Sequence, residues 1–264
     1  MKKSLALDFG KFNSDSYPQA ATALHLSNTG KTHETPVHTH QKCQLVIPLH
    51  GIVKCRVDNA IWMVPVNSAI WIPSHMPHSN QISPSTKVCM LFIDPNEIDM
   101  PNNAFTLSIS LLIKELVLYL TTQNQHYSRN DQTSQLVEVL LHQITTMERE
   151  KFYFSIPQEK RLNELAHHLL INPNDRKTIT EWAANYSMSE RTFTRLVKKN
   201  VGTTFGRWRG QLHLILALQM LGEDESVQRV ADKLGYESVS AFISFFRKAL
   251  GTSPKKYIKE LNKY

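Results

Sequence analysis

The sequence lacks any segment long and apolar enough to cross a membrane. It has no run of 18 apolar residues, and its best candidate, residues 107–120, contains Lys114 and Glu115. A helix that spans a bilayer needs about 20 predominantly apolar residues. The first residues reach Asp8 before they build an apolar core, so we expect no secretion signal. These absences predict a cytoplasmic protein with no membrane partner.

Cysteine is also scarce. Only Cys43, Cys55 and Cys89 occur in the 264 residues, an odd number at wide spacings. This pattern excludes a disulfide framework and agrees with a reducing compartment. We therefore expect free thiols that are buried as structural side chains. Cys43 and Cys89 are also candidates for soft metal ligands or redox sensors.

Charge is distributed unevenly along a chain of globular composition, with 41% hydrophobic and 20% charged residues. Its length favours two domains. Residues 1–150 hold 11 Lys and Arg against 12 Asp and Glu, a net charge of −1, whereas residues 151–264 hold 19 against 11, a net charge of +8. A basic domain beside a nearly neutral one indicates a polyanionic partner, and the alternative is a charge that serves solubility alone.

The first part of the chain is predicted to be rich in strands. Between residues 31 and 95, short runs of Val, Ile and Trp alternate with Pro, Gly, Asn, Asp and Ser, which is typical of a β-sandwich or barrel. The predicted strands are 44–49, 51–57, 61–64, 69–72 and 88–93.

Between residues 105 and 148 the apolar residues recur with the spacing of a helix. Apolar residues from Leu107 to Leu120 predict one helix, and the spacing of Leu136, Val139, Leu140 and Ile144 predicts a second. Their apolar stripes need a covering surface. Two surfaces compete for that role, the barrel wall and a second copy of the chain in a homodimer.

After a short aromatic joint at residues 151–158, the chain reads as a series of short helices. Thr178 and Glu181 form a predicted capping box, and Ser253-Pro254 is typical of a helix start. Helix C-caps are expected at three glycines, namely Gly202, Gly222 and Gly251. The predicted helices are 159–170, 179–185, 189–199, 204–221, 227–233, 238–249 and 254–262.

A repeat lies within these helices. Residues 182–189 align with residues 230–237, and after one extra residue Phe193 aligns with Phe242 and Val197 with Phe246. Each copy has a short helix, a tight turn and a second helix, which is the helix-turn-helix pattern. Gly235 occupies the second turn, where a positive φ is expected. Ser187 holds the equivalent place, so the first turn is expected to differ.

The second helix of each copy carries the candidate DNA contacts on its outward side. Arg reads guanine in the major groove with two hydrogen bonds, and Lys meets phosphates. The alternative for each side chain is a solvated helix face. The first copy offers Arg191, Thr194, Arg195, Lys198 and Lys199, and the second offers Val239, Ser240, Ile243 and Ser244, with Arg247, Lys248, Lys255 and Lys256 as phosphate partners.

Three segments in this region carry a family resemblance. GYESVSAFISFFRK at 235–248, GTSPKKY at 251–257 and MSERTFTRLVK at 188–198 resemble the signature of AraC/XylS-type transcription regulators. The resemblance covers residues 160–262 and implies two helix-turn-helix units joined by a long helix at 205–221. It implies base reading by Arg191, Thr194 and Arg195 in one helix-turn-helix unit. In the other it implies base reading by Val239, Ser240, Ile243 and Ser244. This chain has Ser244 where the family often has Arg, which predicts more shape-based reading by the second unit.

The first part resembles a second family. His38-Thr-His40 followed by Gln44 and Gly51 has the spacing of the first cupin motif, and residues 73–78, PSHMPH, resemble the second. In metal-binding cupins the ligands are two His, one Glu and a last His. The resemblance therefore implies a β-barrel with His38, His40 and His78 as ligands of a divalent transition metal. Gln44 stands where those cupins have Glu, which removes a negative charge and weakens the predicted metal site.

The barrel has two further interpretations besides a metal site. It is either a pocket for an organic effector, with the histidines and Gln44 as hydrogen-bond partners, or a structural histidine cluster. Trp62 and Trp71 are candidate pocket-lining residues, with core packing as the alternative for each.

These patterns predict a fold with a β part and an α part. We expect a cupin-like β-barrel sensor over 1–104, a helical dimerisation segment over 105–150, and an all-α DNA-binding domain over 151–264. The two helix-turn-helix units are expected at about 179–199 and 227–249.

The leading functional prediction is a homodimeric, one-component transcription regulator that is not an enzyme. A small-molecule effector or metal would control its binding to double-stranded operator DNA, and an activator of this kind would also contact RNA polymerase. Two other classes compete. A cupin-type dioxygenase or isomerase would need the acidic residue that Gln44 replaces, and a nucleic-acid protein without sequence preference would not need a ligand-sized barrel.

Overall fold

The computed structural model describes residues 12–261 except residues 29, 52, 59, 65, 67, 85, 151 and 152. Among these, the chain divides into two compact units. The first comprises residues 12–58 and 63–150, and the second comprises residues 60–62 and 153–261. No described helix is long and apolar enough to span a lipid bilayer.

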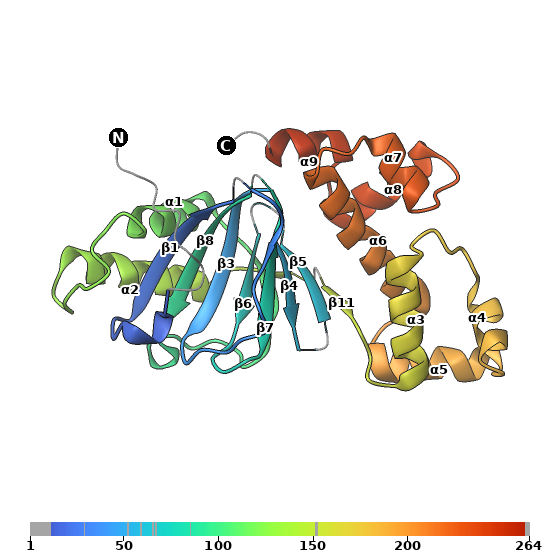
Figure 1. Cartoon of the computed structure of the whole chain (residues 1–264), viewed down its shortest axis with the longest axis horizontal. Helices are drawn as coiled ribbons and strands as arrows, with labels where there is room; N and C mark the ends of the chain where they lie inside the picture. The colour runs from blue at the N-terminus through green and yellow to red at the C-terminus, as the bar shows by residue number, and fades with distance from the viewer. Residues whose placement is uncertain are drawn as a thin grey trace. The chain divides into compact units, whose positions relative to one another are not determined.

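Two sheets form the β part of the chain (Figure 1). The six-stranded sheet has the order β1 (Ala21–Ser27), β8 (Lys87–Ile93), β3 (Cys43–His50), β6 (Ser68–Ile72), β9 (Phe105–Ser108) and β10 (Arg149–Glu150). The five-stranded sheet has the order β11 (Tyr153–Ser155), β5 (Ala60–Val64), β4 (Val53–Val57), β7 (His78–Ile82) and β2 (His33–Glu34). The paired strands recorded in both sheets are antiparallel.

The expected barrel is not closed. In the described residues the strands form two separate sheets, arranged like a β-sandwich. Of the four edge strands, β2, β10 and β11 are two or three residues long, whereas β1 has seven residues. The three short edges offer too few backbone groups to continue a hydrogen-bond ladder from one sheet to the other.

Both faces of the six-stranded sheet are buried. All but the last residue of β3 is buried, which explains why its sequence is apolar almost throughout rather than alternating. Odd-numbered side chains such as Leu45 and Leu91 pack in the core beneath the helices. Even-numbered neighbours such as Gln44 and Phe92 therefore lie on the opposite face of the sheet.

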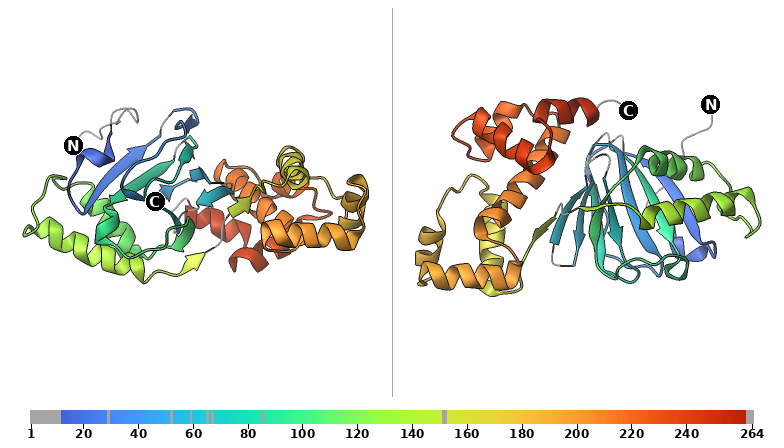
Figure 2. Two further views of the ribbon diagram at one scale, coloured as in Figure 1. Left: turned by 90° about the horizontal axis from the view of Figure 1, so that it is seen from below. Right: turned by 180° about the vertical axis from the view of Figure 1, so that it is seen from behind.

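Two helices, α1 (Leu111–Leu120) and α2 (Gln132–Thr145), cover the outer face of this sheet (Figures 1 and 2). Ile113 and Val117 of α1 are completely buried against it. The prediction that the first helix includes Leu107 is wrong, because Leu107 pairs with Arg149 in the sheet. The helix starts where the Ser110 hydroxyl accepts a hydrogen bond from the backbone N–H of Ile113 at 3.3 Å.

The second unit is helical, and each predicted helix occurs within two residues of its expected bounds. The helices are α3 (Lys160–Ile171), α4 (Ile179–Asn185), α5 (Glu190–Val201), α6 (Phe205–Gly222), α7 (Val227–Lys233), α8 (Val239–Leu250) and α9 (Pro254–Leu261). Two short 3-10 helices, η1 (Ser14–Ser16) and η2 (Pro95–Glu97), lie in the first unit.

The local stop and start signals of these helices are largely confirmed. Thr178 and Glu181 form the predicted capping box, and Gly202 and Gly251 are left-handed C-caps. The prediction for Gly222 is wrong, because it is the last residue of α6 and the chain turns at Asp224, whose φ is 61°.

Candidate DNA-binding interface and sensor cavity

The two helix pairs α4–α5 and α7–α8 have the same turn. In the first, the backbone N–H of Met188 donates to Ala183 O at 2.9 Å, and in the second Tyr236 N–H donates to Ala231 O at 2.9 Å. The φ angles at the turn are 55° for Ser187 and 71° for Gly235. The expected difference between the turns is therefore wrong at the level of the backbone, since Ser187 adopts the left-handed conformation that its glycine counterpart adopts.

The helices of each pair pack through the residues that the repeat singles out. Ala183 and Ala231 are at most 1% exposed, which lets the paired helices approach closely. Four large side chains of the second helices, Phe193, Val197, Phe242 and Phe246, are completely buried. Burial of one face leaves the opposite face of α5 and of α8 to solvent.

The free face of α5 is basic. Arg191, Arg195 and Lys198 are exposed and Thr194 is half-buried. Residues spaced by three and four positions share one side of a helix, so these cations form a single row.

The free face of α8 is uncharged over its first two turns. Ser240 and Ser244 are exposed, and Val239 and Ile243 are half-buried. Basic residues follow only in the last turn, where Arg247 and Lys248 are exposed. The two recognition helices thus have the same backbone geometry, but α5 presents cations where α8 presents uncharged side chains.

The long helix α6 connects the two helix pairs (Figure 2). Trp208 anchors α6, because its ring is completely buried and stacks on the Phe154 ring with 5.2 Å between the ring centroids. Its Nε1–H also donates a hydrogen bond to Ser155 O at 3.0 Å. These contacts fix the first half of α6 to β11.

The second turn is held by contacts to α6 and to the loop before α4. A Cβ added at Gly235 would lie 3.0 Å from Asn174 O. Behind the turn, the buried His213 ring contacts Pro173 O through Nε2 at 3.0 Å and Tyr236 Oη through Nδ1 at 3.3 Å. Burial, helped by the charge of Arg209, lowers the pKa of His213 to about 4.

In the first unit, the structure brings His38, His40 and His78 together. One ring nitrogen of each lies within 4.8 Å of the other two. His78 is buried in β7, His40 is half-buried and His38 is exposed. His38 and His40 lie in the segment between β2 and β3, where His38 makes a single β-bridge to His78. Burial lowers the pKa of both His40 and His78, and that of His78 falls to about 4.

Gln44, the fourth predicted member, joins this cluster. Its Oε1 lies 3.4 Å from His40 Nε2, and its amide nitrogen donates to Met90 Sδ at 3.4 Å. The histidines His38 and His40 and Gln44 line a cavity of about 420 Å³, whose walls also include Leu24, Phe92 and Asn80. The cavity thus combines a polar end with an apolar wall, as sites for small molecules commonly do.

The two tryptophans lie elsewhere. Trp71 is 1% exposed in the core beneath the helices and donates from Nε1 to Pro101 O at 3.1 Å. Trp62 stacks on Tyr153 with 4.7 Å between ring centroids. Neither residue lines the histidine cavity. The three cysteines are free and buried, and burial raises the pKa of the Cys89 thiol to about 12.

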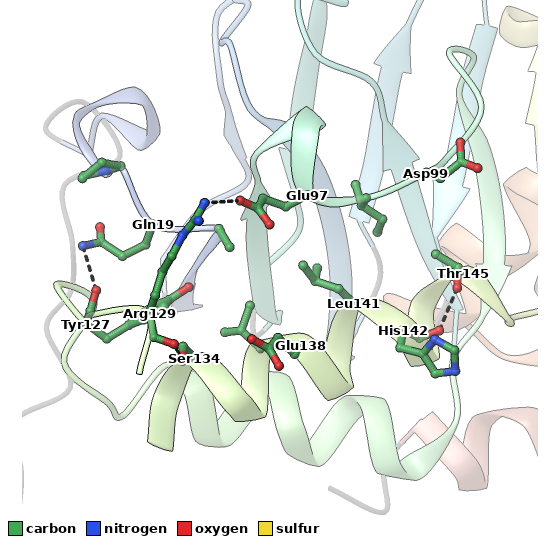
Figure 3. A pocket seen from close by; sticks show the side chains of 14 residues that line it. Gln19, Glu97, Asp99, Tyr127, Arg129, Ser134, Glu138, Leu141, His142 and Thr145 are labelled. Atoms are coloured by element: carbon green, nitrogen blue, oxygen red, sulfur yellow. Dashed lines mark hydrogen bonds and ion pairs between the residues drawn. The ribbon is translucent and has the colours of Figure 1, made fainter. Parts of the chain in front are cut away.

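A second cavity, of about 670 Å³, was not predicted from the sequence (Figure 3). It lies between α2 and the segments around residues 18–20 and 97–99. Arg129 and Glu97 form an ion pair at 3.3 Å across it, and the Tyr127 hydroxyl donates to Ala21 O at 2.8 Å. Its walls join residues more than 100 positions apart, so the sequence gives no local signal for it.

Comparison with known proteins agrees with this architecture. The model of the AraC-like ligand binding domain matches residues 23–166, and a helix-turn-helix domain model matches residues 182–260. The HTH-type transcriptional regulator NimR of Escherichia coli is 36% identical over 97% of this chain and 93% of its own length. The probable transcriptional regulator LumQ of Photobacterium leiognathi is 22% identical over 83% of this chain and 90% of its own.

Among solved structures, ToxT from Vibrio cholerae O395 covers 92% of this chain and 98% of its own, with a TM-score of 0.40 and 13% identity. The family models and the full-length similarity to a regulator point to a transcription regulator rather than to an enzyme. The chain belongs to the AraC family of transcription regulators, with an N-terminal ligand-binding domain and a C-terminal helix-turn-helix domain that binds DNA.

Proposed function

We propose that α5 and α8 enter successive major-groove segments on one face of operator DNA and that α5 makes most of the base-specific contacts. The observation that carries this proposal is the row of exposed cations on α5, at Arg191, Arg195 and Lys198. Arginine on a recognition helix pairs with guanine through two hydrogen bonds, which is the commonest specific contact in the major groove. Thr194 lies beside the two arginines on the same helix.

The second recognition helix has a different task in this proposal. Val239 and Ile243 suit apolar contact with thymine methyl groups, and Ser240 and Ser244 accept or donate single hydrogen bonds. Arg247 and Lys248 bind phosphates in the half-site of α8, as Lys198 does in that of α5. The half-site under α8 is therefore read mainly through DNA shape.

Selection of bound sites from random DNA with the full chain, followed by titration, tests the reading by α5. Arg195→Ala should weaken binding to the selected site by about 1–3 kcal/mol and relax the base preference at one position. Arg161→Ala is a matched control, because Arg161 is exposed on α3 and paired with Glu159 at 2.7 Å. An equal loss on all sequences would assign Arg195 to the phosphate backbone instead.

We also infer that the chain acts as a homodimer through α1. Leu111, Leu112 and Tyr119 of this helix are 61%, 53% and 56% exposed. An apolar face of this kind is typical of a protein interface. Sedimentation of Leu112→Glu should show monomers where the unaltered chain forms dimers. Val37→Glu, at a 71% exposed apolar site outside α1, should leave the dimer intact.

Occupancy of the histidine cavity is proposed to control DNA binding. An effector shifts the equilibrium only if it binds the DNA-competent and incompetent states with different affinity. In vitro transcription with purified RNA polymerase then distinguishes activation from repression.

A further inference from the structure

The second cavity, the α2 cavity, is separate from the histidine cavity, and no described residue lines both. Its floor is apolar, formed by the buried Val137 and Leu141 and the half-buried Ile98. Val137 and Leu141 belong to the core beneath the helices, so the two cavities lie on opposite faces of the six-stranded sheet. A volume of about 670 Å³ with an apolar floor and polar walls is typical of a small-molecule site.

The polar walls of the α2 cavity offer mainly hydrogen-bond acceptors. Three hydroxyl groups, those of Tyr127, Ser134 and Thr145, each donate to a backbone carbonyl oxygen. A hydroxyl has one proton, so these three groups can only accept from a ligand. The Gln19 amide nitrogen donates to Tyr127 O at 3.3 Å, and Gln19 Oε1 is buried without a hydrogen-bond partner among the described residues. A buried acceptor of this kind normally has a donor, which a ligand can supply.

The rim of the α2 cavity is acidic. Three exposed carboxylates, those of Glu97, Asp99 and Glu138, stand against one exposed guanidinium, that of Arg129. Arg129 pairs with Glu97 at 3.3 Å, whereas no ion pair joins Asp99 or Glu138 to another described residue. A cleft lined by charge of one sign attracts ions of the opposite sign. The cavity therefore favours a ligand that carries positive charge and hydrogen-bond donors.

The acceptors are spread along the cavity rather than gathered at one point. Figure 3 shows Gln19 and Glu97 toward one end and Asp99 toward the other, with Leu141 between them. Within the part of the chain that the structure describes, only the histidine cluster gathers three side chains around one possible metal ion. The carboxylates of the α2 cavity therefore suit an extended cation better than a single metal ion.

From this arrangement we propose that the α2 cavity binds an aliphatic polyamine, a flexible chain of methylene groups that carries two or more ammonium groups. An ammonium group has donors and no acceptor, which complements walls rich in acceptors. The terminal ammonium groups bind the carboxylates of Glu97 and Asp99, and Glu138 attracts the charge between them. The methylene groups lie against Val137 and Leu141, where they lose contact with water. This site is independent of the control proposed for the histidine cavity.

Binding of spermidine to the full chain, without DNA, tests the site. Isothermal titration calorimetry at low ionic strength should give one equivalent per chain, since salt screens charges at an exposed rim. Spermidine should also raise the thermal unfolding midpoint, because a ligand of the folded state stabilises it. Mg²⁺ at an equal concentration of charge should leave most of the spermidine bound. Complete displacement by Mg²⁺ would show an adventitious counterion effect only and would overturn the proposal.

Two variants change the charge of the rim in opposite directions. Glu138→Gln should weaken spermidine binding about fivefold, and Arg129→Gln, which frees Glu97 from its ion pair, should tighten it about threefold. Glu34→Gln is the charge-matched control, because Glu34 is exposed on β2 outside the cavity, and it should leave the affinity unchanged. All three altered side chains are exposed, so the variants should unfold without ligand at the midpoint of the unaltered chain. The proposal fails if the folded chain binds no spermidine, or if Glu138→Gln and Glu34→Gln bind it equally well.

Discussion

The turn of the first helix-turn-helix unit is left-handed at Ser187 and that of the second at Gly235, and both are closed by the same backbone hydrogen bond at 2.9 Å. Their surroundings differ. Gly235 lies against the backbone of Asn174, and the turn residue Tyr236 contacts the buried His213. Ser187 is exposed. The second helix-turn-helix unit is thus packed tightly against the rest of its domain, whereas the first helix-turn-helix unit carries the cationic face.

This difference indicates a division of labour. A recognition helix that reads bases needs charged side chains on a free surface, as α5 has at Arg191 and Arg195. A helix that reads DNA shape needs chiefly to be held in place, and the contacts behind the turn before α8 provide this. Four experiments test the comparison.

The largest effect is expected from Gly235→Ala. The left-handed φ of 71° and the approach of a new Cβ to 3.0 Å from Asn174 O both oppose the substitution. Together they should lower the free energy of unfolding by about 3 kcal/mol. Gly251→Ala is the matched control, because its φ is 70° but a Cβ there would meet nothing within 4 Å, so it should cost only about 1 kcal/mol. Denaturant unfolding measures both, and equal losses would show that Asn174 plays no part.

The next largest effect is a pH dependence of stability that arises from His213, behind the turn of the second helix-turn-helix unit. His213 has a pKa of about 4 in the folded chain, below its ordinary value of 6.5. The unfolded state therefore binds the proton more readily, and stability falls as the pH drops from 6.5 toward 4. Between pH 7 and pH 5 the loss from this residue should be about 2 kcal/mol.

The variant His213→Gln isolates that contribution. The stability difference between pH 7 and pH 5 should be smaller in the variant than in the unaltered chain by about 2 kcal/mol. Other titrating groups, including His78, cancel in this comparison because both proteins contain them. The same pH dependence in both proteins would contradict the role given to His213.

The repeat and the helix bounds were predictable from sequence because their signals are local. Thr178 and Glu181 are three positions apart, and the side chain of each accepts a hydrogen bond from the backbone N–H of the other. Gly202 and Gly251 end helices with their own φ angles. Interactions of this kind depend on neighbours within one turn, which the sequence places side by side.

What the sequence did not reveal depends on distant partners. Leu107 continues the apolar pattern of the helix that follows, yet its pairing with Arg149 draws it into the sheet. The open sandwich results from three short edge strands, β2, β10 and β11, whose length is set by the pairing itself. The cavity at α2 joins Tyr127 to Ala21, and no pattern links those positions.

The histidine site lies between these extremes. The resemblance of residues 38–51 and 73–78 to the two cupin motifs implied that His38, His40 and Gln44 lie near His78, and the structure brings all four together. The orientation of each ring was not predictable, because it is set by the carbonyls of Pro36, Lys42 and Met76. Trp62 and Trp71 were equally ambiguous, since a buried aromatic looks the same in sequence whether it faces a cavity or a core.

A smaller effect is expected from Ser187→Gly in the first turn. A non-glycine residue at a φ of 55° carries a conformational cost of about 1–2 kcal/mol, which glycine removes. Glycine also makes the unfolded chain more flexible, which offsets about half of that gain. The variant should therefore be more stable by about 0.5 kcal/mol, seen as a higher denaturant midpoint with an unchanged slope. A loss of stability would mean that the Ser187 side chain has a role of its own.

The smallest effect at fixed salt should come from Lys198→Gln on α5 and Arg247→Gln on α8, which align in the repeat and are both exposed in the last turn of their helices. If each contacts one phosphate, each substitution should reduce the slope of log affinity against log salt by about one, without changing base preference. Lys233→Gln is the control, because Lys233 forms an ion pair with Glu225 on the non-reading helix α7. Equal slopes for the two variants would place both helices at the DNA backbone and confine the difference between the units to the bases. A change for Lys198 alone would mean that α8 stays off the DNA, and the comparison between two reading modes would become one between a reading unit and a structural one.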